Sequence, residues 1–216
     1  GVETLAEMKT VIRMGVDLIQ GYYTSKPKPL FLDKISSDVV DEIISTNLEN
    51  RSEGTKKIYN ARNETELDLL KLALEKYTDI TVHQSKLTLV SDASKQVKMN
   101  ILIPDNSSCE LTIKNINILS GNNRPSIILG EYSRLELNVL KKNKLSYSGI
   151  YVPQGSQLEI KGSGDLLIDS FATVGIGIGN DFEHSYGDIF INMTGSLEIM
   201  SNNEDTVCIG GGYNTE

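Results

Sequence analysis

Apolar and polar residues alternate along the chain from about residue 80 onward. A period of two is typical of β-strands that bury one face. Four segments show it clearly: Glu110–Lys114, Arg134–Asn138, Gln157–Lys161 and Gly195–Ile199. A second set of apolar segments lies between them: Ser126–Gly130, Gly149–Pro153, Gly175–Gly179 and Val207–Gly211. This half of the chain is therefore predicted to be rich in strands and repetitive.

The repeats recur at intervals in the low twenties. The intervals are 24 and 23 residues for Leu111, Leu135 and Leu158, and 22 and 26 residues for Ile128, Ile150 and Ile176. This period predicts a parallel β-solenoid, in which each coil buries its inward residues against its neighbours. A β-sandwich is the alternative, but its strands would follow one another every 8 to 12 residues or so.

Residues 1–49 show helical spacing instead. Apolar residues three and four apart predict a helix over residues 5–14, with a capping box at Thr4 and Glu7 and a terminating glycine at Gly15. A short apolar run predicts a buried strand over residues 18–22, and the spacing between residues 30 and 47 predicts a second helix. This alternation of helix and strand is typical of parallel α/β proteins.

Two polar residues stand at unusual places in this segment. Glu3 precedes the first helix, and Gln20 interrupts an apolar run. Because ligands of parallel α/β proteins meet the carboxyl ends of the strands, both side chains are predicted to reach one rim. The alternative is structural: Glu3 favours the helix dipole, and Gln20 hydrogen-bonds to backbone.

Residues 1–48 resemble the C-terminal end of an EAL domain, a (β/α)-barrel family of cyclic-di-GMP phosphodiesterases. The resemblance rests on GVET at residues 1–4, QGY at residues 20–22, and the helix, Asp17 and proline-containing loop around them. It implies a (β/α)-barrel remnant in which Glu3 and Gln20 are catalytic-site residues. It also implies that Gln20, Tyr22 and Pro27 lie at the substrate.

The resemblance covers only a small part of the family's barrel, which needs about 250 residues. The glutamate that precedes GVET in the family, the metal ligands and the catalytic lysine would all lie upstream. We therefore expect this fragment to be inactive alone and to bind no cofactor. In the intact enzyme, Mg²⁺ or Mn²⁺ would support hydrolysis of cyclic-di-GMP to linear pGpG. The resemblance further implies a cytoplasmic location, compatible with an upstream membrane anchor, and a homodimer formed through the EAL domain.

A polar stretch at residues 50–56 predicts a linker between domains 1–49 and 57–216. The alternative is a surface loop within one domain. A leucine stripe, with capping-box spacing between Asn63 and Glu66, predicts a helix over residues 64–78. We expect this helix to cap the solenoid, because an open end exposes apolar residues and unpaired strand edges. The solenoid is expected to be truncated at Glu216.

Composition narrows the choice of partners. The 216 residues carry a net charge of −8, which disfavours nucleic acid as a partner. No apolar run reaches the ~18 residues of a membrane span. The two cysteines, Cys109 and Cys208, are predicted to be free, buried thiols.

The solenoid offers weaker candidate sites. An acidic run at residues 180–188 lengthens one coil, and carboxylates beside His184 would suit Ca²⁺ or a sugar; a solvated loop is the alternative. The candidates are Asp165, Asp169, Asp181, Glu183, His184 and Asp188. His83 is interpreted as a surface or half-buried side chain.

Three functions are compatible with these patterns. The first is a fragment of a cyclic-di-GMP phosphodiesterase. The second is a β-helix module that binds a glycan or a protein, since the repeats resemble right-handed β-helix modules of bacterial carbohydrate-binding and surface proteins. The third combines them, with the solenoid as an accessory domain that localises the phosphodiesterase or tunes its dimerisation.

Overall fold

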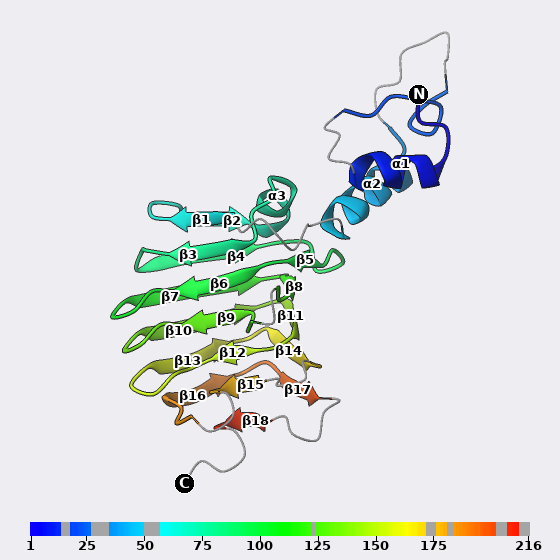
Figure 1. Cartoon of the computed structure of the whole chain (residues 1–216). Helices are drawn as coiled ribbons and strands as arrows, with labels where there is room; N and C mark the ends of the chain where they lie inside the picture. Colours follow the sequence, from blue (N-terminus) through cyan, green and yellow to red (C-terminus); the bar gives the residue numbers. More distant parts are fainter. Residues whose placement is uncertain are drawn as a thin grey trace. The chain divides into compact units, whose positions relative to one another are not determined.

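The structure is a computed structural model that describes residues 1–13, 18–26, 35–49, 57–121, 124–171, 176–180, 184–201 and 207–211. The chain divides into two compact units, Gly1–Ser52 and Glu53–Glu216 (Figure 1). The linker predicted at residues 50–56 lies outside the described residues.

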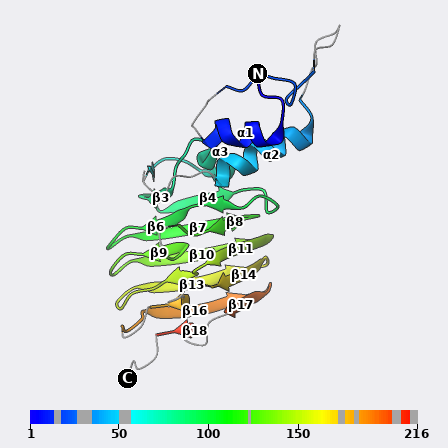
Figure 2. The same ribbon diagram turned by 45° about the vertical axis from the view of Figure 1, so that its right-hand side comes forward.

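The second unit is a parallel β-solenoid of about five turns (Figures 1 and 2). Its seven-stranded sheet contains β1 (Ile58–Ala61), β3 (Asp79–Val82), β6 (Asn100–Ile103), β9 (Ile127–Leu129), β12 (Ile150–Tyr151), β15 (Ile176–Gly179) and β18 (Val207–Gly210). The six-stranded sheet contains β2 (Glu66–Asp68), β4 (Lys86–Val90), β7 (Ser108–Lys114), β10 (Arg134–Leu140), β13 (Gln157–Gly162) and β16 (Asp188–Met193). The five-stranded sheet contains β5 (Val97–Lys98), β8 (Asn117–Leu119), β11 (Lys142–Tyr147), β14 (Asp165–Ser170) and β17 (Leu197–Ser201).

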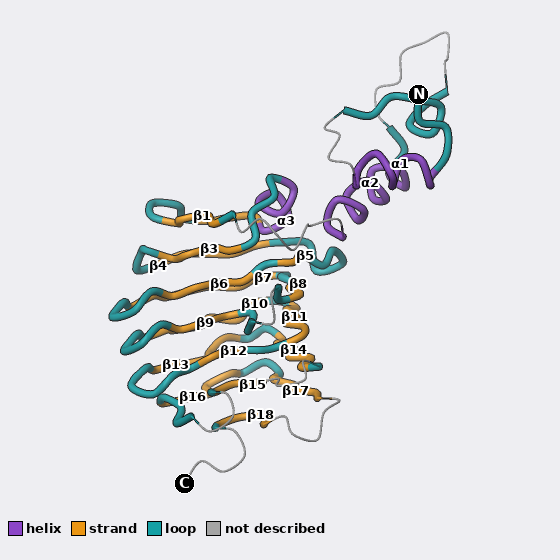
Figure 3. The backbone as a smooth tube through the Cα atoms, viewed as in Figure 1, coloured by secondary structure: helices purple, strands orange, loops and turns teal. Residues whose placement is uncertain are grey.

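Parallel pairing of strands from successive coils confirms the solenoid and excludes the β-sandwich. Leu87, Leu111, Leu137 and Ile160 lie in one inward column and are fully buried. Figure 3 shows the pattern as short strands joined by turns at each corner. Each coil is therefore held by its neighbours, as expected when no single coil can bury its own apolar face.

The register differs from the predicted one in four places, one of which is that Ile150 pairs with Ile178 and not Ile176 in the next coil. Leu111 pairs with Leu137 and not Leu135, a slip of two residues that keeps the same face inward. In the seven-stranded sheet, Ile150 stacks on Ile127 and not Ile128. The segment at residues 195–199 belongs to the five-stranded sheet, and β16 takes its predicted place below β13.

The helix predicted over residues 64–78 is wrong at its start. Residues 66–68 form strand β2, and only Leu69–Leu74 form helix α3. Its N-cap is Asp68, whose side chain accepts hydrogen bonds from the amides of Leu70 and Lys71. Asp68 therefore replaces Asn63 as the capping residue, because the preceding residues pair with β4 in the six-stranded sheet.

The first unit contains helix α1 (Leu5–Arg13) and helix α2 (Ser37–Glu49), which pack on each other. Met8 and Ile12 of α1 are buried, and Lys9 Nζ lies 2.5 Å from Glu42 Oε1 on α2. Helix α1 confirms the predicted helix over residues 5–13, and its predicted terminating glycine, Gly15, lies outside the described residues. Helix α2 starts at Ser37, later than predicted. Residues 30–34 lie outside the described residues.

The strand predicted over residues 18–22 is wrong. Leu18 is 89% exposed, and residues 22–24 form a turn. Among the described residues, backbone hydrogen bonds join this segment only to Val2, which is too short a partner for a strand ladder. The described part of residues 1–49 thus shows two helices and no strand, so the predicted barrel remnant is not seen.

Candidate functional site

The N-terminus of α1 forms the predicted capping box. Thr4 Oγ1 accepts a hydrogen bond of 3.2 Å from the amide of Glu7. Glu7 Oε2 in turn accepts one of 2.8 Å from the amide of Glu3. These two bonds satisfy amides that have no partner within the helix and fix the direction in which residues 1–3 enter it.

Residues 1–3 lie against the QGY segment. The amide of Val2 donates to the carbonyl of Gln20 at 2.9 Å, and the amide of Tyr23 donates to the carbonyl of Val2 at 3.1 Å. Gly21 faces Val2 so closely that an added Cβ would lie 2.0 Å from the Val2 carbonyl oxygen. Only glycine fits there, so the glycine of QGY has a steric role in bringing the two motifs together.

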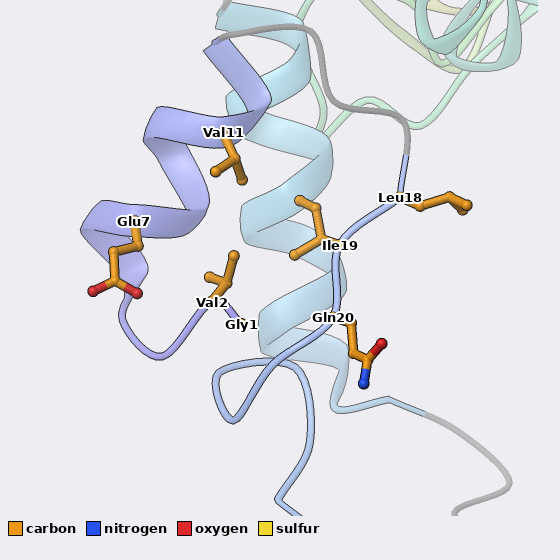
Figure 4. A pocket seen from close by; sticks show the side chains of 7 residues that line it. All are labelled: Gly1, Val2, Glu7, Val11, Leu18, Ile19 and Gln20. Carbon is orange, nitrogen blue, oxygen red and sulfur yellow. The ribbon is translucent and has the colours of Figure 1, made fainter.

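An open cavity of about 430 Å³ lies beside this contact (Figure 4). Its lining residues are Gly1, Val2, Glu7, Val11, Leu18, Ile19 and Gln20. Figure 4 shows Val2, Val11 and Ile19 turned toward one another, whereas Leu18 and the amide of Gln20 point away. The cavity is therefore apolar at its centre, with the Gln20 side chain at its outside.

The predicted site residues are only partly brought together. Glu3 and Gln20 are exposed and are linked through the backbone of Val2, and Tyr22 is 57% exposed. Pro27 lies outside the described residues. The segment can present polar groups to a ligand, but its described residues form no catalytic constellation.

The described residues do not fit a divalent metal. They contain no group of three His, Cys, Asp or Glu side chains close enough to hold an ion. Mg²⁺ or Mn²⁺ would therefore need ligands from elsewhere, and no step of chemistry through a metal follows from these residues.

Two of the acidic candidates of the solenoid, Asp165 and Asp169, make contacts between coils. Lys144 Nζ lies 2.9 Å from Asp169 Oδ2, and Ser196 donates a 2.7 Å hydrogen bond to Asp165. Asp181 and Glu183 lie outside the described residues. Asp188 and His184 are exposed. His83 is also exposed and makes a 3.0 Å hydrogen bond with the side chain of Asn60, as its interpretation as a surface residue required.

The lengthened coil is longer at two corners. At the first corner, Ile150 and Gln157 are seven positions apart in the sequence. The residues that pair with them in the next coil, Ile178 and Asp188, are ten positions apart. At the second corner, Tyr147 and Ile150 are three positions apart in the sequence. The residues that pair with them in the next coil, Ser170 and Ile178, are eight positions apart. The run at residues 180–188 therefore accounts for the smaller insertion, and the larger one precedes β15.

Both cysteines are free, as predicted, but only Cys109 is buried. Burial, with a smaller contribution from Glu110, raises the pKa of the Cys109 thiol to about 11. Cys109 is therefore a packing residue, since the thiolate is the reactive form.

Sequence reasoning missed a buried ion pair. Asp79 is fully buried, and Arg124 Nη1 lies 2.6 Å from its Oδ1. Thr78 donates a further hydrogen bond of 2.8 Å to the same carboxylate. Arg124 reaches past the intervening coil, whose Asn100 donates to the carbonyl of Pro125 at 2.8 Å. The partners are 45 positions apart in the sequence, so no local pattern predicts the pair.

Exposed tyrosines mark one corner of the solenoid. Tyr132, between β9 and β10, is 68% exposed, and Tyr186, between β15 and β16, is 48% exposed. Gly155 occupies the coil between them, where an added Cβ would lie 2.8 Å from the Tyr132 ring. With coils about 4.8 Å apart, the two tyrosines are roughly 10 Å apart along the solenoid.

A comparison with known protein families, curated proteins and solved structures finds no match to this chain. The likeness of residues 1–48 to an EAL domain therefore rests on its motifs alone. Among the described residues, no helix has the length and apolar character needed to cross a membrane.

Proposed function

We propose that residues 1–49 are the C-terminal part of an EAL-type cyclic-di-GMP phosphodiesterase, to which the solenoid is attached as an accessory module. The supporting observation is the pairing of the GVET and QGY segments through Val2 and Gln20. This pairing is what two motifs on one rim of a barrel require.

The roles proposed for the site residues follow from this arrangement. Glu3 supports the rim, and Gln20 helps to place the substrate or the attacking water, with Tyr22 and Pro27 at the substrate. The remaining barrel would supply the Mg²⁺ or Mn²⁺ ligands, and bound metal would provide the hydroxide that attacks the phosphodiester. The proposed location is the cytoplasm, and the proposed assembly is a homodimer through the EAL domain.

A chimera tests the phosphodiesterase proposal. Residues 1–49 replace the corresponding end of an active EAL enzyme, and hydrolysis of cyclic-di-GMP to linear pGpG is measured with Mg²⁺ or Mn²⁺. We expect an active chimera in which Gln20→Ala lowers kcat/KM by about tenfold or more. Ser25→Ala is the matched control and should leave turnover unchanged. A folded but inactive chimera, or full activity of Gln20→Ala, would contradict the proposal.

The exposed tyrosines favour a second candidate function for the solenoid, binding of a glycan. Flat aromatic faces provide large apolar contact areas at little cost in conformational entropy, as sugar rings require. Tyr132 and Tyr186 present two such faces on one corner with Gly155 between them.

A glycan panel probed with the full chain, with and without Ca²⁺, tests this second function. Tyr132→Ala and Tyr186→Ala should each weaken binding, whereas Tyr22→Ala, an equally exposed tyrosine of the first unit, should not. Absence of binding across a broad panel would leave the solenoid a structural or protein-binding role.

We also propose that α3 caps the first coil. Leu69, Leu72 and Ala73 of α3 are buried, and the helix lies beside β2 and β5. Tyr59 of β1 stacks edge-on against Tyr77, with ring centroids 5.2 Å apart, and donates a 2.7 Å hydrogen bond to Glu64. These contacts cover residues that would otherwise form an open apolar end.

A further inference from the structure

The outer face of the seven-stranded sheet carries a continuous row of uncharged side chains. The row consists of Thr81, Leu102, Ile128 and Tyr151, which pair in register on β3, β6, β9 and β12. The residues on either side of each one along its strand are buried, whereas these four are partly exposed, so they point outward. Figure 1 shows their four strands stacked one below another. We call these four residues the uncharged strip.

The uncharged strip lies on inner coils of the stack. β1 pairs with β3 on one side, and β15 pairs with β12 on the other. Further coils would extend the stack along its axis and would not lie over this face. The exposure of the strip therefore does not depend on where the stack ends.

The outer faces of the other two sheets are charged. On the six-stranded sheet, Glu110, Glu136 and Glu159 pair in register, so three successive coils each present a carboxylate. On the five-stranded sheet, Lys144 of β11 forms an ion pair with Asp169 of β14. The lack of charge along the uncharged strip therefore distinguishes one face from the rest of the solenoid.

The size of the uncharged strip indicates a chain-like occupant. Four coils about 4.8 Å apart, each about four residues wide, give a flat area on the order of 250 Å². A stable protein interface buries about 800 Å² on each partner, so this face alone is too small to hold a second copy or a folded partner. A linear polymer that runs along the stack can cover it completely.

The uncharged strip also borders the corner that carries the exposed tyrosines. Tyr132 lies four positions after Ile128 in the sequence. Pro153, two positions after Tyr151, forms an isolated bridge with Tyr186. The strip and the tyrosine corner therefore form one continuous surface.

Charge selects the chemistry of the polymer. A cationic polymer would meet no carboxylate along the strip, and burying its charges there without partners costs free energy. An anionic polymer would be repelled by a chain whose net charge is −8. The sugar rings of a neutral glycan have apolar faces that suit the side chains of Leu102 and Ile128 and the ring of Tyr151.

We propose that the uncharged strip binds a linear, uncharged glycan whose chain runs along the solenoid axis across β3, β6, β9 and β12. This inference rests on the glycan function proposed for the solenoid and narrows it to neutral polysaccharides, with the exposed tyrosines at the edge of the same surface. Because the contacts repeat from coil to coil, affinity rises with the number of sugar units.

Oligosaccharides of matched length test the proposal on the full chain. The neutral probes are cellohexaose, xylohexaose and mannohexaose, and the charged probes are the hexamers of glucosamine and galacturonic acid. Isothermal titration calorimetry should show a neutral hexaose that binds about tenfold or more tightly than either charged hexamer, and more tightly than the trisaccharide of the same sugar. A charged hexamer as the best ligand, or equal affinities for the trisaccharide and the hexaose, would overturn the proposal.

Variants of the chain locate the bound glycan. Ile128→Lys should weaken binding of the neutral hexaose by about tenfold, because the glycan would have to desolvate the ammonium group. Thr88→Lys, at a half-buried outward position of β4 in the six-stranded sheet, is the matched control and should bind like the unchanged chain. Leu102→Ala removes contact area without adding a charge and should weaken binding a few-fold. Urea midpoints of all three variants separate loss of fold from loss of binding.

The outcomes separate this inference from the glycan function itself. Binding that is lost in Tyr132→Ala but kept in Ile128→Lys and Leu102→Ala would leave the glycan at the tyrosine corner and overturn the strip. Binding of no glycan would overturn both. Light scattering of the free chain adds a further check. A dimer that Ile128→Lys dissociates would overturn the inference, because the occupant would then be a second copy of this chain.

Discussion

At the scale of the residue, buried polar groups connect coils that are not neighbours. Asp79 and Arg124 are joined across an intermediate coil, and Asn100 of that coil accepts from the amide of Gly121 as well as donating to Pro125. A fully buried carboxylate is tolerated only when it is paired and hydrogen-bonded. The ion pair therefore neutralises the buried Asp79 carboxylate and also holds in place the segment between β8 and β9 that carries Arg124.

Removing one partner of this pair should be costly. Arg124→Met leaves the Asp79 carboxylate buried without its cation, and we expect a loss of about 3 kcal/mol in the free energy of unfolding. Urea denaturation followed by circular dichroism measures it. Lys86→Met removes the cation of an exposed pair and should cost less than ~1 kcal/mol. Equal effects of the two substitutions would show that the Asp79 carboxylate is better solvated than its burial indicates.

A second residue-scale prediction concerns pH. The hydrogen bond from Tyr59 and the amides of Asn63 and Arg62 lower the pKa of Glu64 to about 2, from an ordinary value of 4.5. A carboxylate with a lowered folded-state pKa stabilises the fold above its unfolded-state pKa, and that contribution is lost as pH falls through the folded-state value. Stability should therefore fall between about pH 4.5 and pH 2. In Glu64→Gln, urea midpoints measured across this range should show a smaller fall, whereas an unchanged pH profile would contradict the assignment.

At the scale of the element, the periodicity of apolar residues predicted whether a segment is a helix or a strand better than it predicted which residues pair between strands. Alternation placed most strands, but it repeats every two residues, so the slip between Leu135 and Leu137 could not be detected from sequence. The run Ile127-Ile128-Leu129 has no alternation, which explains why the wrong isoleucine was matched to Ile150. Residues 66–68 fit both a helix face and a strand, and pairing with β4 decided between them.

For the candidate site too, the sequence predicted which segments meet but not how their side chains are oriented. Motif spacing predicted that the GVET and QGY segments would meet, and Gly21 and Val2 supply the contact. The orientation of the Gln20 side chain depends on packing that no local pattern encodes. The barrel strand was wrongly predicted because a five-residue apolar run needs neighbouring strands to become one, and the described residues offer it only Val2.

Helix α3 offers an element-scale test of the proposed cap. Leu69→Ala should lower the free energy of unfolding by about 2 to 5 kcal/mol, because it leaves a cavity at a fully buried position. Leu74→Ala on the same helix, where the side chain is 44% exposed, is the control and should cost much less. Thermal or urea unfolding of the two variants measures the difference. Similar losses would mean that α3 does not cover the first coil.

At the scale of the whole molecule, the two compact units have different sources of stability. The solenoid combines inward apolar columns with a repeated backbone ladder, so its stability is approximately a sum over adjacent coils. The described part of the first unit has two short helices, two buried apolar residues on α1, and a backbone contact through Val2. We therefore expect the solenoid to resist denaturant longer than residues 1–52.

The reach of Arg124 over an intervening coil has a mechanical meaning. A stack in which every layer touches only the next would fray steadily from an unprotected terminus, one layer at a time. The Asp79–Arg124 ion pair and Asn100 between its partners link three successive coils. None of these coils can unfold without breaking a contact that it shares with the other two. Pulled or heated from its C-terminal side, the stack should unravel gradually up to Arg124 and then give way in a single cooperative event.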